Sequence, residues 1–177
     1  MSDVLVQMSY VTPIGELRLV ASDRGLCGLV FADSRGCEWL ARHTARWFPG
    51  WPTVQGESAH HRSLEAARRW LDRYFEDPRG ADTAAVPLDM RGATFELRVW
   101  QALLQVPSGS TSSYGAIAKS LGSPGAARAV GAANGANPVS LIVPCHRIIG
   151  SNGSLTGYGG GLHRKEWLLK HEGARLF

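Results

Sequence analysis

Short apolar runs separated by turn residues characterise the beginning of the chain. The runs occupy residues 4–10, 15–21 and 25–31 and are rich in Val, Leu and Ile, a composition that favours strands. Thr12-Pro13 separates the first two runs, and the turn-forming residues 22–25 precede the third. This spacing predicts an antiparallel meander of three strands.

Two helical patterns follow, over residues 34–48 and 60–76. In the second segment the apolar residues recur at roughly helical spacing, at Leu64, Ala67, Trp70, Leu71 and Phe75. Pro78-Arg79-Gly80 ends this helix. We expect residues 80–93 to be irregular chain or a linker, with a short strand near residues 86–88.

The chain changes character after this segment and becomes rich in short helical patterns. Thr94 is the expected cap of a helix that runs to about Gln105, and Glu96 lies in its first turn, where a carboxylate favours the helix dipole. The apolar stripe of this helix consists of Phe95, Val99, Trp100, Leu103 and Leu104.

A pair of short helices is expected next. The first covers residues 114–121, with Ser112 or Ser113 as its cap and Gly122 just after its end.

The second helix of the pair is expected to begin with Ser123 as N-cap and Pro124 at the first helical position, and to run to about Asn134. Two short helices joined by a Gly-Ser-Pro turn are a helix-turn-helix candidate. A last helix is expected over residues 164–171. Together these elements predict an α/β (α+β) protein with two domains, residues 1–90 and residues 91–177.

Composition is that of a soluble globular protein, with 177 residues of which 44% are hydrophobic and 19% charged. No apolar stretch approaches the roughly 18 residues that span a bilayer, and the N-terminus lacks the pattern of a signal peptide. The cysteines, Cys27, Cys37 and Cys145, show no CxxC spacing. This argues against a disulfide framework or a zinc ribbon and predicts a cytoplasmic protein.

Charge is distributed unevenly along the chain. Residues 1–90 hold 10 Lys and Arg against 12 Asp and Glu, whereas residues 91–177 hold 9 against 3. A basic C-terminal half is typical of a protein that binds a polyanion, although a basic surface without such a role explains the charge alone equally well.

The second helix of the pair is unusual because its side chains are small. Between Gly125 and Asn134 only Arg128 is long, whereas a helix that reads bases in the major groove presents several polar side chains. A smooth helix with one cation suits close approach to a narrow groove, with one side chain inserted into the base stack. The alternative is a helix packed tightly against its neighbours, with Arg128 solvated.

Candidate chemistry centres on Cys145, which lies between Pro144 and His146 in an apolar run. A neighbouring imidazole is a standard means of activating a thiol. Successive side chains of a regular strand point to opposite faces, so either the chain turns here or a water bridges sulfur and imidazole. The alternative is a buried, inert cysteine. A zinc site formed by Cys145 with His146, His163 or His171 lacks a second thiolate and the ligand spacing of a helix.

Two further features lie downstream of this cysteine. Glu172 follows the last helix, where a carboxylate opposes the helix dipole; it either orients an imidazole or is simply exposed. The run Gly157-Tyr158-Gly159-Gly160-Gly161 lacks the context of a phosphate-binding loop. Its glycines allow backbone amides to approach a ligand, or they form a flexible hairpin.

Several separate motifs in this order resemble the O6-alkylguanine-DNA alkyltransferase family. The resemblance is specific from about residue 94 to residue 173, and is weaker before it, where residues 12–15 are the main echo. The motifs are Gly125-Ala126-Ala127-Arg128-Ala129-Val130-Gly131, Asn137-Pro138, Pro144-Cys145-His146-Arg147, Gly157-Tyr158-Gly159-Gly160-Gly161 and Lys165-Glu166-Trp167-Leu168-Leu169.

The resemblance implies a DNA-repair protein that takes an alkyl group from O6 of guanine, and less well from O4 of thymine, onto its own cysteine, irreversibly. It implies that Cys145 is the nucleophile and His146 its base through a water. Glu172 then orients His146, and Asn137 supports the turn between the DNA-binding helix and the active site.

The same resemblance implies the DNA contacts. Arg128 fills the gap left by the extruded base, which must leave the duplex before its O6 can be reached, and Tyr114 crowds the phosphate of the rotating nucleotide. The helix would approach the minor groove through Ala126, Ala127, Ala129 and Gly131, and the guanine pocket would consist of Tyr158, Gly159, Gly160 and Ile148.

The family resemblance also implies a ribonuclease-H-like N-terminal domain with a small antiparallel sheet, and a mostly helical C-terminal domain with a helix-turn-helix and an active-site loop. The expected partner is duplex DNA containing alkylated guanine, bound by a monomer, with cooperative assembly on DNA left open. We expect no cofactor, no metal and no membrane contact. Two other functions remain as alternatives: a binding module without chemistry, and a cysteine hydrolase that uses Cys145 and His146.

Overall fold

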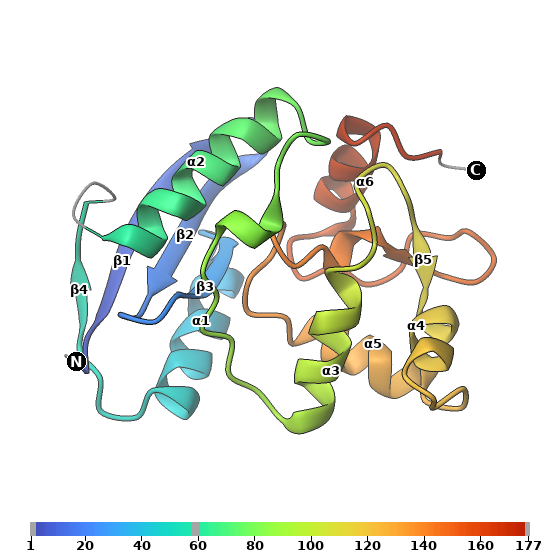
Figure 1. Cartoon of the computed structure of the whole chain (residues 1–177), viewed down its shortest axis with the longest axis horizontal. Helices are drawn as coiled ribbons and strands as arrows, with labels where there is room; N and C mark the ends of the chain where they lie inside the picture. Colours follow the sequence, from blue (N-terminus) through green and yellow to red (C-terminus); the bar gives the residue numbers. More distant parts are fainter. Residues whose placement is uncertain (1–2, 58–60, 176–177) are drawn as a thin grey trace. The chain divides into compact units, whose positions relative to one another are not determined.

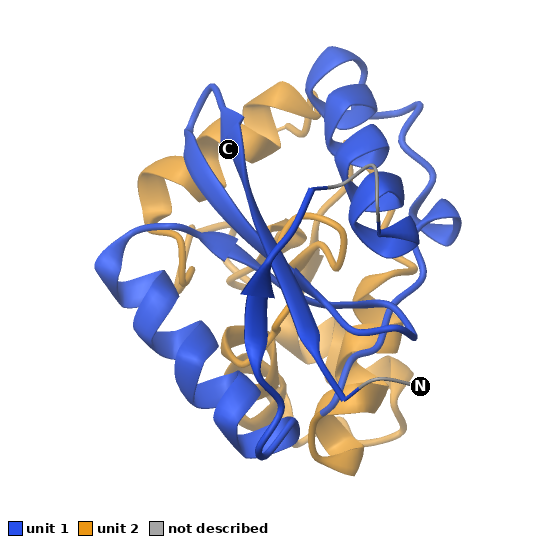
Figure 2. Cartoon of the chain, turned by 90° about the vertical axis from the view of Figure 1, so that its left-hand side faces the viewer, with its two compact units in different colours: residues 1–91 blue, residues 92–177 orange. Residues whose placement is uncertain are grey.

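The computed structural model describes residues 3–57 and 61–175 of the chain. It divides into two compact units, Met1–Arg91 and Gly92–Phe177, which Figure 2 shows in different colours. The first unit combines a small sheet with two helices, and the second is mostly helical (Figure 1). The α/β (α+β) class expected from the sequence is confirmed.

A four-stranded sheet in the order β3-β2-β1-β4 forms the centre of the first unit. Its antiparallel meander of β1 (Leu5–Thr12), β2 (Gly15–Ala21) and β3 (Leu26–Phe31) confirms the prediction from the apolar runs. The strand β4 (Thr53–Gln55) pairs in parallel with β1 and was not expected. All three of its residues are exposed, so no alternation of buried and exposed positions marks it in the sequence.

Two helices contact this sheet and close the core of the first unit. Helix α1 (Ser34–Trp47) begins at Asp33, whose carboxylate accepts the Gly36 N–H at 2.8 Å. Helix α2 (Arg62–Glu76) confirms the second helical pattern, although residue 60, where it was expected to begin, lies outside the described residues. Both helices contact β3, which explains why β3 is buried along its whole length.

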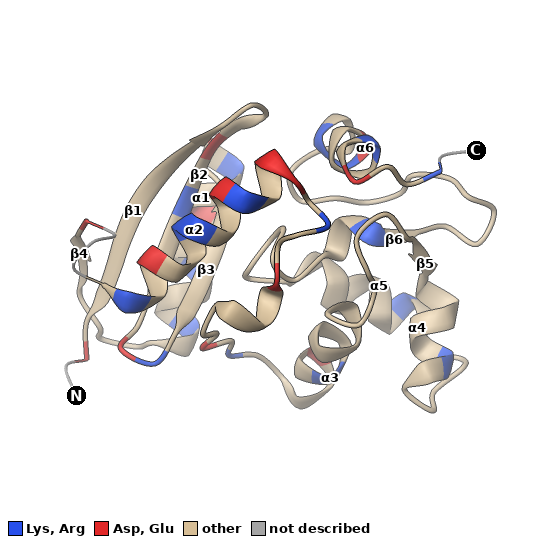
Figure 3. Ribbon diagram, turned by 45° about the horizontal axis from the view of Figure 1, so that its top comes forward, with Lys and Arg blue, Asp and Glu red and all other residues tan. Residues whose placement is uncertain are grey.

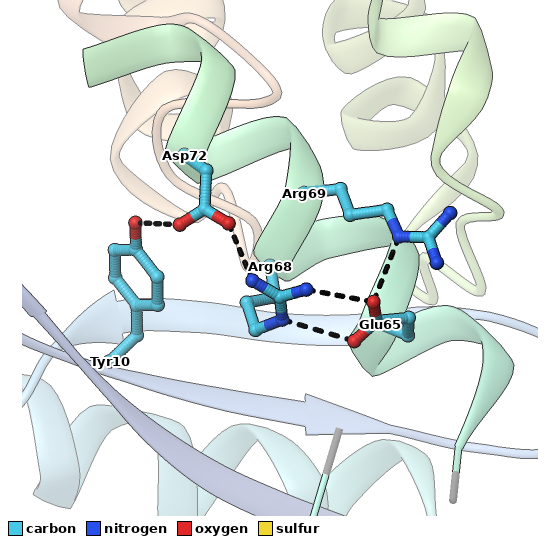
Figure 4. Close-up of polar contacts among 5 residues, drawn as sticks. All are labelled: Tyr10, Glu65, Arg68, Arg69 and Asp72. Atoms are coloured by element: carbon cyan, nitrogen blue, oxygen red, sulfur yellow. Dashed lines mark hydrogen bonds and ion pairs between the residues drawn. The ribbon is translucent and has the colours of Figure 1, made fainter. Parts of the chain in front are cut away.

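A network of charged side chains on α2 reaches the neighbouring strand β1 (Figure 4). Arg68 donates to Glu65 at 2.8 Å and also pairs with Asp72. Asp72 in turn accepts the Tyr10 hydroxyl of β1 at 2.7 Å. Arg69 donates to the same Glu65 at 2.8 Å. The positive charges of this part of α2 are therefore neutralised by neighbours on the same helix.

The segment that follows α2 is irregular, as expected. It holds one short 3₁₀ turn, η2 (Thr83–Ala85), and Leu88 forms an isolated bridge with Leu26 of β3. The short strand expected near residues 86–88 is thus reduced to a single bridge.

Helix α3 (Thr94–Leu103) opens the second unit. Ala93, not Thr94, occupies the N-cap position, and Thr94 is the first helical residue, so the predicted cap was wrong by one residue. The Glu96 carboxylate caps the helix instead, because it accepts the Ala93 N–H at 2.8 Å. The helix also ends two residues earlier than the expected Gln105.

The helix pair consists of α4 (Tyr114–Ser120) and α5 (Ala127–Gly135). The Ser113 hydroxyl accepts the Ala116 N–H at 3.1 Å and confirms one of the two proposed caps. Gly122 has a φ of +73°, the left-handed conformation that ends a helix and that glycine adopts without strain.

The predicted start of the second helix was wrong. Ser123 does not cap it, because Ser123 to Ala126 form a separate turn in which the Ala126 N–H donates to the Ser123 carbonyl at 2.9 Å. Ala126 is the N-cap residue. The Trp100 indole anchors α5 from α3, since its Nε1 donates to the Ala133 carbonyl at 2.8 Å.

Three small elements complete the second unit. Cys145–Arg147 form a 3₁₀ turn, η3, and the strand β6 (Ile148–Ile149) follows it directly. β6 pairs in parallel with β5 (Ser112–Ser113), the pair of residues that precedes α4. The last helix, α6 (Leu162–His171), begins two residues earlier than predicted.

Candidate active site

The apolar run around Cys145 is a buried segment that turns at the cysteine. Every residue from Leu141 to Ile149 is buried, and Cys145 itself is 5% exposed. Leu141 has a φ of +68°, which is costly for a residue with a branched side chain. Side chains of adjacent residues in a regular strand would point to opposite faces, but Cys145 and His146 lie in the turn η3 and not in a strand.

Two asparagines hold this segment in place. Asn137 donates from Nδ2 to the Val143 carbonyl at 2.8 Å, and its Oδ1 accepts the Val139 N–H at 3.0 Å. Asn134, on the last turn of α5, donates to the Cys145 carbonyl at 3.3 Å. The end of α5 is thereby joined to the backbone on both sides of Pro144. Asn134 was not predicted, because one more polar residue at a helix end gives no distinctive signal.

His146, Arg147 and Glu172 form a buried charged cluster. The His146 Nε2 lies 2.7 Å from Glu172 Oε1, and Arg147 donates to both carboxylate oxygens, each at 2.9 Å. Arg147 also donates to the Val106 carbonyl at 2.6 Å. Glu172 is 2% exposed. The carboxylate that opposes the dipole of α6 is therefore compensated by a guanidinium and an imidazole.

Burial controls the protonation of the cysteine and the histidine. It raises the pKa of the Cys145 thiol, against a smaller opposing effect of the hydrogen bond with Asn137. Burial also lowers the pKa of His146, although Glu172 opposes this change. The resting site therefore holds a neutral thiol beside a neutral imidazole.

The carboxylate determines which nitrogen of His146 is basic. Burial alone raises the pKa of Glu172, but His146 and Arg147 together lower it well below its ordinary value, so Glu172 is ionised. An ionised carboxylate 2.7 Å from Nε2 requires that this nitrogen carries the proton. Nδ1, which has no hydrogen-bond partner among the described residues, is then free to accept one.

Lys165 is a further buried charge that the sequence analysis did not assign to the site. Its ammonium donates to the Ile148 carbonyl, to Thr156 at 2.8 Å and to Gly157 at 3.4 Å. It therefore joins β6, directly after the cysteine turn, to the start of the glycine loop. Burial lowers its pKa to about 8. The signal was present in the sequence, because Lys165 shares a helical face with Leu168 and Leu169.

The expected pocket residues differ in burial. Ile148 is fully buried in β6. The Tyr158 ring lies edge-on to His146, with 6.5 Å between the ring centroids. Gly160 accepts the Arg164 guanidinium at 3.1 Å, while a Cβ added to Gly159 would meet open space. The structure thus brings Tyr158 and Ile148 to the cysteine turn and leaves Gly159 exposed.

The expected DNA-binding residues lie on α4 and α5. Arg128 and Ala129 are exposed, and Ala126, Ala127 and Gly131 are half-buried. The opposite side of α5 packs inward through Val130, Ala133 and Asn134. The outward side therefore has only Arg128 as a long side chain, as the sequence predicted.

Tyr114 connects this surface to the glycine loop. It is the first residue of α4, and its hydroxyl donates to the Thr156 carbonyl at 3.1 Å. Its ring also faces Gly131, where an added Cβ would lie 3.8 Å from it. Thr156 thus accepts hydrogen bonds from both Tyr114 and Lys165.

Neither a candidate metal-binding cluster nor a candidate membrane-spanning helix occurs within residues 3–57 and 61–175. Within those ranges no group of three His, Cys, Asp or Glu side chains is arranged to hold a metal ion. No helix within the same ranges is both long and apolar enough to cross a membrane.

Family comparisons agree with the two units of the structure. Residues 5–90 match the ribonuclease-like domain of 6-O-methylguanine DNA methyltransferase, and residues 94–174 match the DNA binding domain of the same family. The methylated-DNA--protein-cysteine methyltransferase of Salmonella typhimurium is 66% identical over 85 residues, which are 48% of this chain and 50% of that protein. The match thus spans about half the length of this curated relative.

Solved structures cover almost the whole chain. A crystal structure of Mycobacterium tuberculosis O6-methylguanine methyltransferase is 41% identical, with a TM-score of 0.76 over 96% of this chain and 93% of that one. Mycobacterium tuberculosis OGT in complex with DNA is also 41% identical, with a TM-score of 0.72 over 96% and 92%. Both domain matches and the buried Cys145 turn lead to one conclusion: the chain belongs to the 6-O-methylguanine DNA methyltransferase family.

Proposed function

We propose that this protein repairs alkylated DNA by moving the alkyl group from O6 of guanine to Sγ of Cys145, once per molecule. The observation that carries the proposal is the geometry of the cysteine turn, in which a buried thiol lies next to a histidine already oriented by Glu172. Family membership and the DNA complex of the Mycobacterium tuberculosis relative support DNA as the partner.

The chemical step begins with removal of the thiol proton. His146 Nδ1 accepts it through a water, and the resulting imidazolium is stabilised by Glu172, 2.7 Å from Nε2. The Sγ lone pair then attacks the alkyl carbon, a C–S bond forms, and the C–O6 bond breaks with its electrons going to the guanine. The imidazolium returns its proton to the purine through water. The thioether is stable, so the protein is consumed.

Access to O6 requires that the base leaves the duplex. We propose that α5 lies in the minor groove, where Ala126, Ala127, Ala129 and Gly131 allow close approach and Arg128 occupies the gap left by the base. Tyr114 would crowd the phosphate of the rotating nucleotide. Tyr158, Ile148 and the backbone of Gly159 and Gly160 would contact the flipped guanine, and Asn137 would keep the cysteine turn in register with α5.

The two units would have different roles. Residues 91–177 would bind DNA and accept the alkyl group, while residues 1–90 form the ribonuclease-H-like domain. We further propose that the protein acts as a monomer in the cytoplasm, that it repairs O4-alkylthymine less well than O6-alkylguanine, and that it needs no cofactor.

Stoichiometry separates this proposal from its competitors. Wild-type protein is mixed with a molar excess of duplex DNA containing O6-methylguanine, and repaired DNA is counted by chromatography of its nucleosides. We expect one repaired guanine per protein molecule and none with Cys145→Ala. Many turnovers per protein would indicate a hydrolase instead, and binding without loss of the methyl group would indicate a recognition module.

A further inference from the structure

Three arginines of α1 form one straight row on its outer surface. Arg35, Arg42 and Arg46 are all exposed, whereas Leu40 and His43 of the same helix are buried. At 3.6 residues per turn the three positions fall within about 40° of one another, and at 1.5 Å per residue they extend over about 16 Å. We call these three residues the arginine row.

The charges of the arginine row are not neutralised locally. Among the described residues, no member of the row forms an ion pair with Asp or Glu, and Glu38 is the one acidic residue in the sequence of α1. On α2 the opposite holds, and Figure 3 shows blue and red segments alternating along that helix. There the ion pairs join Arg68, Arg69 and Arg73 to Glu65, Asp72, Glu76 and Asp77.

The arginine row is therefore a local positive surface on a unit that is acidic overall. Residues 1–90 hold 10 basic and 12 acidic side chains, so the row does not simply follow the net charge of its surroundings. One guanidinium of the row also lies over an aromatic ring, because Arg46 is 5.0 Å from the ring centroid of the half-buried Trp47. This contact leaves the positive charge of Arg46 in place.

We propose that the arginine row binds the phosphate backbone of DNA, as a contact of the N-terminal unit that is independent of base sequence. Over about 16 Å a duplex presents about five phosphates on each strand, and guanidinium groups bind phosphate in a bidentate manner. The inference rests on the proposed function, because the DNA that the cysteine repairs supplies the polyanion. An acidic protein surface is the competing partner.

Salt dependence of DNA binding tests the inference. Each phosphate contact contributes about 0.9 to the slope of log affinity against log salt concentration. We compare wild-type protein with the triple variant Arg35→Gln, Arg42→Gln, Arg46→Gln by fluorescence anisotropy on an undamaged duplex. The slope is expected to become shallower by about 2 to 3.

A matched control removes the same net charge from α2, through Arg68→Gln, Arg69→Gln and Arg73→Gln. It is expected to change the slope by less than about 1, since those arginines are already paired. A Lys substitution at all three positions of the row is expected to restore most of the wild-type slope. Circular dichroism shows whether each variant is folded.

Equal slopes for wild type and the row variant would overturn the inference. Weaker binding to polyglutamate together with an unchanged DNA slope would assign the row to an acidic protein, and would overturn it as well. The proposed function has a separate readout, the methyl group gained by Cys145 at saturating DNA. Suppose that the wild-type protein gains no methyl group but that the triple variant shows the shallower salt dependence. This result would reject the proposed function and still support DNA binding by the arginine row.

Discussion

Arginine and carboxylate are joined in both units, but in opposite surroundings. In the second unit the side chains of Arg147 and Glu172 are 7% and 0% exposed and lie 2.9 Å apart. In the first unit Arg68 and Asp72 make a similar pair with 37% and 49% exposure. Both pairs are attractive, yet water screens the exposed pair of Arg68 and Asp72 and is excluded from the buried pair of Arg147 and Glu172.

Burial changes what such a pair can do. An exposed pair adds little to stability, because its partners are nearly as well solvated when they are apart. A buried pair is costly to assemble, and it is still more costly to leave half complete. The cluster around Glu172 therefore fixes the orientation and tautomer of His146, whereas the network on α2 mainly ties a helix to a neighbouring strand.

Removal of the buried carboxylate is expected to have the largest effect. Glu172→Ala leaves Arg147 and His146 without their shared acceptor, and should lower the free energy of unfolding by about 3–5 kcal/mol. Urea titration followed by circular dichroism measures this. Glu172→Gln keeps the shape and is the control; it should recover part of the loss. A loss below about 1 kcal/mol for Glu172→Ala would mean that the buried pair of Arg147 and Glu172 contributes no more to stability than an exposed ion pair.

Replacement of the histidine tests the chemical role of the same cluster. His146→Gln should slow alkyl transfer by about 10²–10⁴-fold, because the general base is lost. Rapid-quench measurement of the single turnover gives the rate. The exposed His163 serves as the control, and His163→Gln should change the rate less than twofold. Equal rates for the two variants would contradict the assignment of His146 as the base.

Lys165 makes stability depend on pH in a defined window. Burial lowers its pKa from 10.5 to about 8, so the unfolded chain binds more protons than the folded chain between these values. The free energy of unfolding should therefore rise with pH from 8 to 10.5, by about 1–3 kcal/mol. Urea titrations in a Cys145→Ser background, with and without Lys165→Met, isolate this contribution. An equal rise in both proteins would show that another group titrates.

The smallest effect is expected on α2. Asp72→Asn removes one charge from the exposed network and keeps an oxygen that can accept the Tyr10 hydroxyl, so stability should fall by less than about 1 kcal/mol. The same change should be smaller still in high salt. Thermal unfolding at low and high salt measures it, and a loss as large as that of Glu172→Ala would remove the contrast between the two networks.

Local patterns predicted the parts of the fold that depend on local physics. The meander followed from apolar runs, and the Ser113 cap and Gly122 followed from the chemistry of helix ends. The strand β4 and the start of α5 did not. The first has no pattern because it is fully exposed, and the Ser123-Pro124 pair that resembles a helix start instead forms a turn before it.

The residues of the candidate site were predicted from sequence motifs, whereas most of the contacts between them could not be predicted from local sequence patterns. Cys145 and His146 are adjacent in the sequence, but Glu172 reaches His146 only because α6 folds back onto the turn. Arg147 and Lys165 were missed, since long basic side chains are rarely buried. Arg147 directly precedes Ile148 and Ile149 in a long apolar run, and Lys165 shares a helical face with Leu168 and Leu169. These contexts are the signals by which the two buried side chains could have been found.

The most direct test of the account is the mass of the peptide that contains Cys145. The protein is incubated with duplex DNA containing O6-methylguanine, digested, and compared with protein incubated with undamaged DNA. The account predicts that this peptide gains one methyl group in stoichiometric amount, while the peptides of Cys27 and Cys37 are unchanged. A methyl group on another residue, or an unmodified Cys145 after the DNA has lost its methyl group, would contradict it.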